Sequence, residues 1–273
     1  MVVRALVAFL LPHRWKGQLA AAKRLLDSPP ESANGVGEKI DAWLESPGWE
    51  VRNAAVKLIA RVRDEARYDR LLGKLADRDE AGIVRRNAAE AIAQIGLRTE
   101  AARSVLLEAM SDPYWEVRAE AIHALAALFP ASDDLERRLL DGLYGPPKSR
   151  RRHIREENFE VRMAIAQAMG CLGVSELAFD ALADLAQDDS WPVRSQVAVA
   201  MAHFATRHPS FLARARRELL AIDRQSEGSV PYFVHRDIVG RAMVAVRDAG
   251  AEPRTDFTDL YLNPKAGWNH IRR

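Results

Sequence analysis

Histidine and cysteine are the side chains best able to bind a metal or attack a substrate, so they show first which chemistry this chain could perform. The seven histidines are scattered along the sequence, and none is followed by glutamate. The single cysteine, Cys171, has no histidine or aspartate near it at helical spacing. A metal site or an activated nucleophile needs several such groups held together. We therefore predict no catalytic residue, no metal site and no cofactor.

A cluster of cations between positions 145 and 155 is a second candidate. The segment contains five cations and no carboxylate, and clustered arginines can bind phosphates or carboxylates. Taking these five from the 40 Lys and Arg residues leaves 35 against 38 carboxylates, so the rest of the chain lacks the broad basic surface of a nucleic-acid binder. We expect the cluster to contact a partner, with an ordinary solvated loop as the alternative. Its cations are Lys148, Arg150, Arg151, Arg152 and Arg155.

A sequence repeat predicts the helices that would position these residues. Five segments begin with Val-Arg, at spacings of 33, 33, 44 and 32 residues. Apolar residues recur four, eight and eleven positions after each valine, which predicts an amphipathic helix, and another amphipathic segment precedes each one. Such units bury their apolar faces only by stacking, so the sequence predicts an all-α stack of helical hairpins. The dipeptides are Val51-Arg52, Val84-Arg85, Val117-Arg118, Val161-Arg162 and Val193-Arg194.

An acidic residue lies six positions before the repeated arginine in four repeats, and Ser46 has that position in the first. An acid in the turn can cap the following helix and bond the arginine of an adjacent repeat. We interpret these residues as a structural ladder. Its predicted members are Asp79 and Arg85, Asp112 and Arg118, Glu156 and Arg162, and Asp188 and Arg194.

These features closely resemble HEAT repeats, in particular the bacterial subgroup named after phycobilisome lyases, whose consensus has an acidic turn, Val-Arg and an alanine-rich second helix. The resemblance covers about residues 35–205, and residues 232–250 look like a degraded sixth second helix with Val234-His235 in place of Val-Arg. It implies a right-handed α-solenoid of about six hairpins. It does not select one function, because HEAT proteins include scaffolds, adaptors, lyase subunits and a few nucleic-acid enzymes.

We expect one solenoid over residues 1–250, with an N-terminal cap at 1–34 and the basic insertion at 145–155. The insertion accounts for the one long spacing between repeats. Residues 251–273 form a tail that is too apolar for a free coil. We expect this tail to cover the exposed end of the last repeat, with insertion into a partner as the alternative.

The resemblance places the second helix of each hairpin on the concave face of the stack. Side chains two, six and ten positions after each valine should project there and contact a partner. The alternative is a shallow groove without a ligand. The predicted contacts are Lys57, Arg61, Arg86, Glu90, Gln94, His123, Gln167 and His203.

We predict a non-catalytic interaction module or adaptor that holds an acidic or helical protein partner in this groove. Two alternatives stay open: a nucleic-acid-binding protein resembling HEAT-like alkylpurine DNA glycosylases, and a bilin lyase-type subunit. A single cysteine fits a reducing compartment, and the apolar start at residues 2–11 is too short to span a bilayer. We therefore expect a cytoplasmic protein without a membrane partner.

Overall fold

The computed structural model describes residues 12–30, 35–145, 153–225, 232–249, 256, 257 and 260. Within these ranges the regular structure consists of α-helices and short 3-10 helices, without a strand. The chain divides into two compact units, Met1–Phe129 and Pro130–Arg273. The all-α prediction is confirmed.

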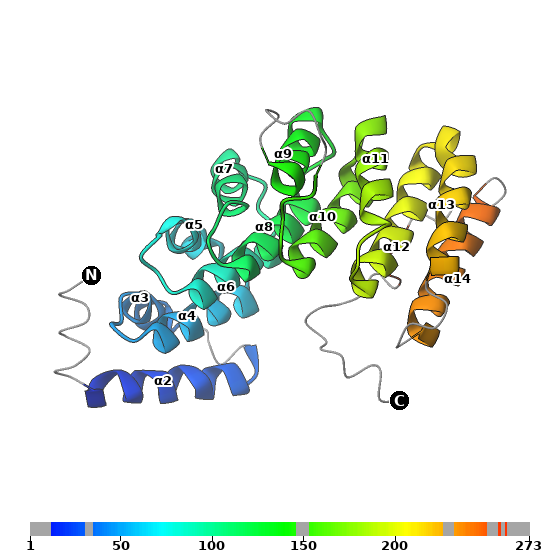
Figure 1. The fold of residues 1–273 in the computed structure, drawn as a ribbon. Helices are drawn as coiled ribbons and strands as arrows, with labels where there is room; N and C mark the ends of the chain where they lie inside the picture. The colour runs from blue at the N-terminus through cyan, green and yellow to red at the C-terminus, as the bar shows by residue number, and fades with distance from the viewer. Residues whose placement is uncertain are drawn as a thin grey trace. The chain divides into compact units, whose positions relative to one another are not determined.

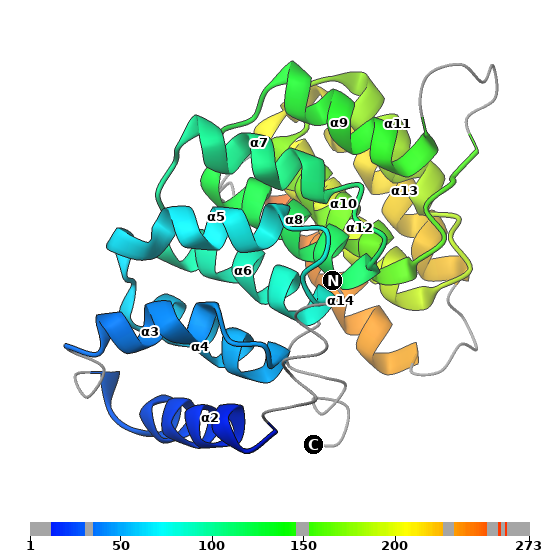
Figure 2. The same ribbon diagram turned by 90° about the vertical axis from the view of Figure 1, so that its left-hand side faces the viewer.

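The first unit contains a leading helix and three helical hairpins. Helices α2, α4, α6 and α8 pack side by side in one layer, and α3, α5 and α7 each cover the second helix of their own hairpin (Figure 1; Figure 2). The 3-10 helix η2 (Glu65–Arg67) leads into α5. The helices are α2 (Pro12–Asp27), α3 (Gly37–Leu44), α4 (Trp49–Val62), α5 (Tyr68–Ala76), α6 (Gly82–Ile95), α7 (Glu100–Ala109) and α8 (Trp115–Leu128).

The second unit repeats this plan with three more hairpins. Helices α10, α12 and α14 pack against one another in sequence order, and α9, α11 and α13 pack on α10, α12 and α14. The 3-10 helix η3 (Pro209–Phe211) joins α12 to α13. The helices are α9 (Asp133–Tyr144), α10 (Phe159–Leu172), α11 (Glu176–Leu185), α12 (Trp191–Arg207), α13 (Leu212–Gln225) and α14 (Tyr232–Asp248).

The predicted apolar stripe forms the core between the two layers. The repeated valines of the second helices are at most 1% exposed. The residue four positions later is Ala55, Ala88 or Ala121 in the first three repeats, and each of these alanines is fully buried. A small side chain at this position lets the neighbouring helix approach closely. The period therefore predicts both the hairpins and the side of each helix that faces the core.

Candidate partner-binding surface

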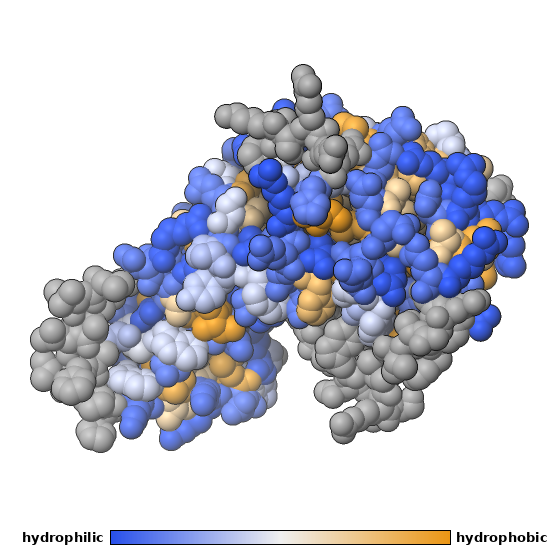
Figure 3. Space-filling view, viewed as in Figure 1, coloured by the Kyte–Doolittle hydropathy of each residue, from blue (hydrophilic) through white to orange (hydrophobic). Residues whose placement is uncertain are grey.

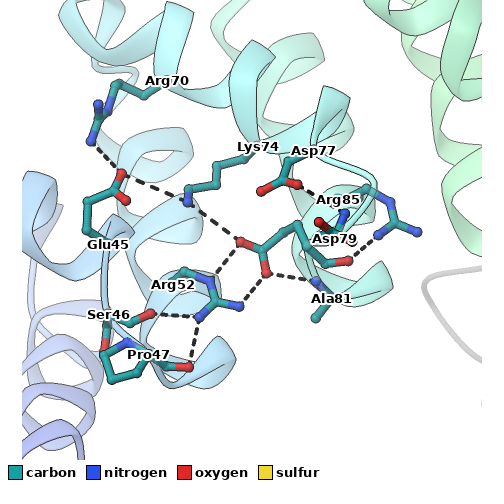
Figure 4. Close-up of polar contacts among 11 residues, drawn as sticks. Glu45, Ser46, Pro47, Arg52, Arg70, Lys74, Asp77, Asp79, Ala81 and Arg85 are labelled. Atoms are coloured by element: carbon teal, nitrogen blue, oxygen red, sulfur yellow. Dashed lines mark hydrogen bonds and ion pairs between the residues drawn. The ribbon is translucent and has the colours of Figure 1, made fainter. Parts of the chain in front are cut away.

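Each repeated arginine of the ladder bonds the turn of its own hairpin, and Arg52, Arg85 and Arg162 also bond an acid in the next hairpin. Arg52 Nη1 donates to the carbonyl oxygens of Ser46 (2.7 Å) and Pro47 (3.0 Å) in the turn before its own helix. Its Nε and Nη2 donate to the two carboxylate oxygens of Glu80, in the next turn, at 2.7 and 2.6 Å (Figure 4). Arg52 and Glu80 are only 7% and 3% exposed. A guanidinium that binds a carboxylate at two points in a dry site fixes how the hairpins stack.

The same two-point contact recurs farther along the chain. Arg85 donates to the Asp112 carboxylate at 2.8 and 3.0 Å, in the first unit. Arg162 donates to the Asp188 carboxylate at 2.6 and 3.1 Å, in the second unit. In both pairs the acid lies in the turn between the two helices of the next hairpin. The geometry therefore uses these side chains in packing rather than presenting them to a ligand.

Asp79 was predicted as a ladder residue, and the structure corrects this to Glu80. The Asp79 side chain is exposed, while its backbone N–H donates to the Asp77 carboxylate at 3.0 Å (Figure 4). Glutamate is one methylene longer than aspartate, so Glu80 reaches Arg52 from one position later. Burial raises the pKa of Glu80, but hydrogen bonds from Arg52 and the Ala81 N–H, with the nearby charges, outweigh it and hold this pKa below its ordinary value.

The ladder changes at both ends of the repeat array. Ser46 replaces the acid in the first turn, and its hydroxyl donates to Gln18 of α2 at 3.0 Å. His235 replaces the arginine in the last repeat, where it is fully buried with its Nδ1 2.5 Å from the Ser195 hydroxyl. Arg194 Nε is the one buried side-chain nitrogen among the described residues for which the structure shows no hydrogen-bond partner. The array therefore ends in neutral contacts instead of ion pairs.

Helices α4, α6 and α8 carry most of the predicted partner contacts on one surface of the first unit, which we call the second-helix face. Lys57, Arg61 and Gln94 on this face are exposed. Arg86, Glu90 and His123 are half-buried. The structure therefore places these predicted contacts on three consecutive helices of one layer.

A polar network ties the second-helix face together around Arg86. Arg86 Nη1 donates to Asn87 at 2.8 Å, and its guanidinium lies 3.7 Å from Glu90 and 3.8 Å from Glu120 of α8. Gln94 donates to Glu90 at 3.1 Å. Because these contacts join α6 to itself and to α8, they hold the side chains in place before any partner arrives.

The α4 end of the same face is cationic. Arg61 donates to the carbonyl oxygens of Leu26 and of Ser28, the latter at 2.5 Å, and so it fixes the end of α2. Lys57 lies one helical turn before Arg61 and is exposed. No carboxylate of a described residue forms an ion pair with Lys57 or Arg61.

The corresponding positions of the second unit are less open. Gln167 on α10 and His203 on α12 are half-buried. The His203 ring stacks on Phe257 from the C-terminal tail, with 4.7 Å between ring centroids and 16° between ring planes. The Cys171 sulfur lies 3.7 Å from His203 Nδ1. Cys171 therefore has a histidine neighbour after all, which comes from the next repeat and not from helical spacing.

Burial and the nearby Arg207 charge lower the pKa of His203 to about 4, although Asp256 acts in the opposite direction. The imidazole is therefore neutral at physiological pH, and it does not stabilise Cys171 as a thiolate. Cys171 and His203 both lie ten positions after the valine of their repeats. Equal offsets in consecutive repeats were the sequence signal that could have paired them.

Most of the predicted basic insertion lies outside the described residues, namely Lys148, Arg150, Arg151 and Arg152. Arg155 is described and exposed, and its backbone N–H donates to the Leu143 carbonyl oxygen at 2.8 Å. This bond attaches the end of the insertion to the last turn of α9.

Neither a candidate metal cluster nor a membrane-spanning helix occurs in the part of the chain that the structure describes. No group of three or more His, Cys, Asp or Glu side chains in the described ranges could hold a metal ion. None of the described helices combines the length and hydropathy needed to cross a membrane. Figure 3 shows mainly hydrophilic residues, with hydrophobic ones in small separate areas.

Comparison with known proteins agrees with this repeat architecture. A family model for HEAT repeats matches residues 38–126 and 71–156. No curated protein matches the chain. One similar solved structure is the complex of CpcE and CpcF of phycocyanin lyase from Nostoc sp. PCC7120, with 18% identity, a TM-score of 0.39, and coverage of 77% of this chain and 94% of that one. This likeness is too distant to support a shared activity. The matched segments identify HEAT repeats over residues 38–156, and the helical hairpins that follow them stack on the same plan.

Proposed function

We propose that this protein is a non-catalytic interaction scaffold that binds an acidic segment of a protein partner across α4 and α6. The observation that carries the proposal is the second-helix face of the first unit. Its α4 end has two exposed cations, Lys57 and Arg61, without a carboxylate partner among the described residues. Surface cations that form no ion pair favour binding of a carboxylate-bearing segment, although one of them, Arg61, also donates to backbone carbonyl oxygens.

The arrangement of Arg86 supports the same proposal. Its contacts with Asn87, Glu90 and Glu120 fix a polar surface across α6 and α8. Side chains that are already ordered lose less conformational entropy when a partner binds. Glu90 and Glu120 also repel phosphates, so the face suits a protein segment of mixed polarity better than a nucleic-acid backbone.

A charge reversal at Lys57 tests this proposal. The Lys57→Glu variant should keep its melting temperature and lose at least tenfold in partner affinity, because one like-charge contact at an interface costs about 1.4 kcal/mol or more. Lys39→Glu is the matched control, since Lys39 is exposed on α3 of the same hairpin. The measurement is partner capture by each purified variant, followed by titration of the captured protein at two salt concentrations.

Two results would contradict the proposal. In the first, the two variants capture the partner equally well. In the second, the wild-type protein binds duplex DNA with an affinity that falls steeply as salt rises, which would favour a nucleic-acid role.

The basic insertion extends the proposal to a second contact. Replacing Arg150, Arg151 and Arg152 with alanine should leave thermal melting nearly unchanged and weaken partner association, more strongly at low salt, where charges are less screened. Calorimetric titration at low and high salt measures this. Unchanged affinity of the triple variant at low salt would show that the cations are ordinary solvated charge.

A further inference from the structure

A short piece of the C-terminal tail packs against α12 of the second unit through Phe257. Phe257 is 1% exposed and Leu260 is 2% exposed, although both follow the last helix of the unit. The Leu260 N–H donates to the Phe257 carbonyl oxygen at 3.0 Å, so a tight turn sets the spacing of the two apolar side chains. Two buried anchors three residues apart on a turn resemble a bound peptide more than a chain end.

The surface under this piece corresponds to one that is open in the first unit. His203 lies ten positions after its repeat valine, as Arg61 and Gln94 do in theirs. Arg61 and Gln94 are exposed, whereas Phe257 covers the His203 ring face to face at 4.7 Å. The tail therefore occupies a place that the repeat pattern leaves available.

The charges around His203 add selectivity to this place. Asp256, directly before the stacked Phe257, is close enough to His203 to act on its charge, and so is Arg207, at the end of α12. Asp256 and Arg207 therefore carry opposite charges within electrostatic reach of the same ring. The apolar anchors supply burial, and Arg207 favours one orientation of the segment.

From this geometry we propose that the surface around His203 and Arg207 is a recognition site for a short protein segment with an acidic residue, an aromatic residue next to it and a leucine three residues later. In the isolated chain, Asp256, Phe257 and Leu260 fill the site in cis. A partner segment with the same chemistry binds there by displacing them. The proposal stands on the contacts of the second unit and does not depend on the partner proposed for the first.

The sole cysteine of the chain reports directly on this site. The Cys171 sulfur is 3.7 Å from the His203 ring that Phe257 covers, and the rate at which a thiol reacts follows its access to reagent. Phe257→Ala in the full chain should raise the labelling rate of Cys171 by a maleimide about tenfold or more, because the tail loses its main buried anchor. Phe257→Tyr should keep the rate near that of the wild type, since the ring still stacks.

Addition of a synthetic peptide then tests recognition in trans. A peptide spanning residues 253–263, in excess, should return the Cys171 rate of Phe257→Ala toward the wild-type rate. The same peptide with alanine in place of Phe257 and Leu260 should have no effect. The Asp256→Lys variant should also loosen the tail while keeping Phe257. Its Cys171 labelling rate should rise above that of the wild type, and the peptide should lower it again.

Circular dichroism melting identifies any variant that fails to fold. If Phe257→Ala does not fold, the labelling rates of Asp256→Lys decide the experiment. An unchanged labelling rate in folded variants would overturn the proposal. Faster labelling that the peptide does not reverse would also overturn it, because the tail would then be a fixed part of the fold. Lys57→Glu should not alter the Cys171 rate, so failure here is separate from failure of the proposed function.

Discussion

The Asp112 carboxylate joins several partners in the ladder. It binds Arg85 at two points, accepts the Tyr114 N–H at 2.9 Å and lies 3.4 Å from Arg78. Asp112 and Arg85 are 2% and 1% exposed, and the Tyr114 ring lies 5.2 Å from the Arg85 guanidinium carbon. Removing one partner of so buried a pair leaves an unpaired charge in a dry site.

We therefore expect Asp112→Ala to lower the free energy of unfolding by about 3 to 5 kcal/mol. Asp79→Ala is the matched control, because the Asp79 side chain is exposed, and its effect should stay within about 0.5 kcal/mol. Urea unfolding followed by circular dichroism measures both. Equal stabilities of the two variants would show that the ladder contributes nothing measurable.

Two histidines make stability depend on pH. Burial, and then the Arg207 charge, lower the pKa of His203 to about 4, against an opposing effect of Asp256. Burial, and then the Arg194 charge, lower the pKa of His235 to about 4, against Asp223 and a bond to a backbone carbonyl. As pH falls below the ordinary value of about 6.5, the unfolded chain binds these protons first. Stability is therefore lost between pH 6.5 and about 4.

Each histidine should contribute up to about 1.4 kcal/mol of lost stability per pH unit in this range. His203→Gln, which removes one titrating group, should give a shallower dependence of unfolding free energy on pH between 6.5 and 5. Denaturant unfolding at several pH values measures the two slopes. Parallel slopes for the variant and the wild type would contradict a neutral buried His203.

The burial of single residues could be predicted where it follows from one helix's own periodicity. Contacts between residues of neighbouring repeats were missed. The repeat valines and their buried stripe follow from one helix's own periodicity. Glu80 was missed because reach, rather than position, decides which acid pairs with Arg52. The pairing of Cys171 with His203 was missed because it depends on the stacking of α10 and α12, not on spacing within one helix.

At the scale of elements, a buried glutamate connects α9 to α11, the first helices of two consecutive hairpins in the second unit. Glu136 of α9 is 4% exposed, and its carboxylate accepts the N–H groups of Val174 (2.6 Å) and Ser175 (3.0 Å) before α11. It also accepts the Ser175 hydroxyl. Ser175 in turn caps α11 by accepting the Leu177 N–H at 3.1 Å. One side chain thus supports the start of the next hairpin.

Glu136→Ala should lower the free energy of unfolding by about 1 to 3 kcal/mol, because it leaves two half-buried N–H donors without this acceptor. Glu157→Ala, at an exposed position of the same unit, should change stability by less than about 0.5 kcal/mol. Thermal melting and hydrogen exchange at the start of α11 check the prediction. If Glu136→Ala melted at the same temperature as the control, Glu136 would not stabilise the fold.

Helices were the most predictable elements, because the apolar stripe and the alanine at its centre specify which side packs. The degraded sixth repeat also forms a hairpin, α13 with α14. The seating of Phe257 was not predictable, since it depends on a surface made by other repeats. That residues 251–273 cover the exposed end of the last repeat therefore stays a prediction.

At the scale of the whole molecule, the repeats explain why architecture is easier to predict than function. Stacking requires the same buried residues in every unit, whereas partner contacts use the exposed positions that stacking leaves unconstrained. Arg61 and Gln94 occupy such positions, at the same offset in consecutive repeats, and they differ in charge. The extent of the solenoid over residues 1–250 stays a prediction, because the two units are described separately.

The most direct test of the central claim maps the partner onto the second-helix face. A photoreactive benzoylphenylalanine is placed at Lys57 or Gln94 on this face, or at Lys39 on α3 as the control, and each protein is irradiated in cells. We predict that the same protein becomes crosslinked from positions 57 and 94 but not from position 39. Equal crosslinking from position 39, or adducts that a nuclease removes, would contradict a protein-binding second-helix face.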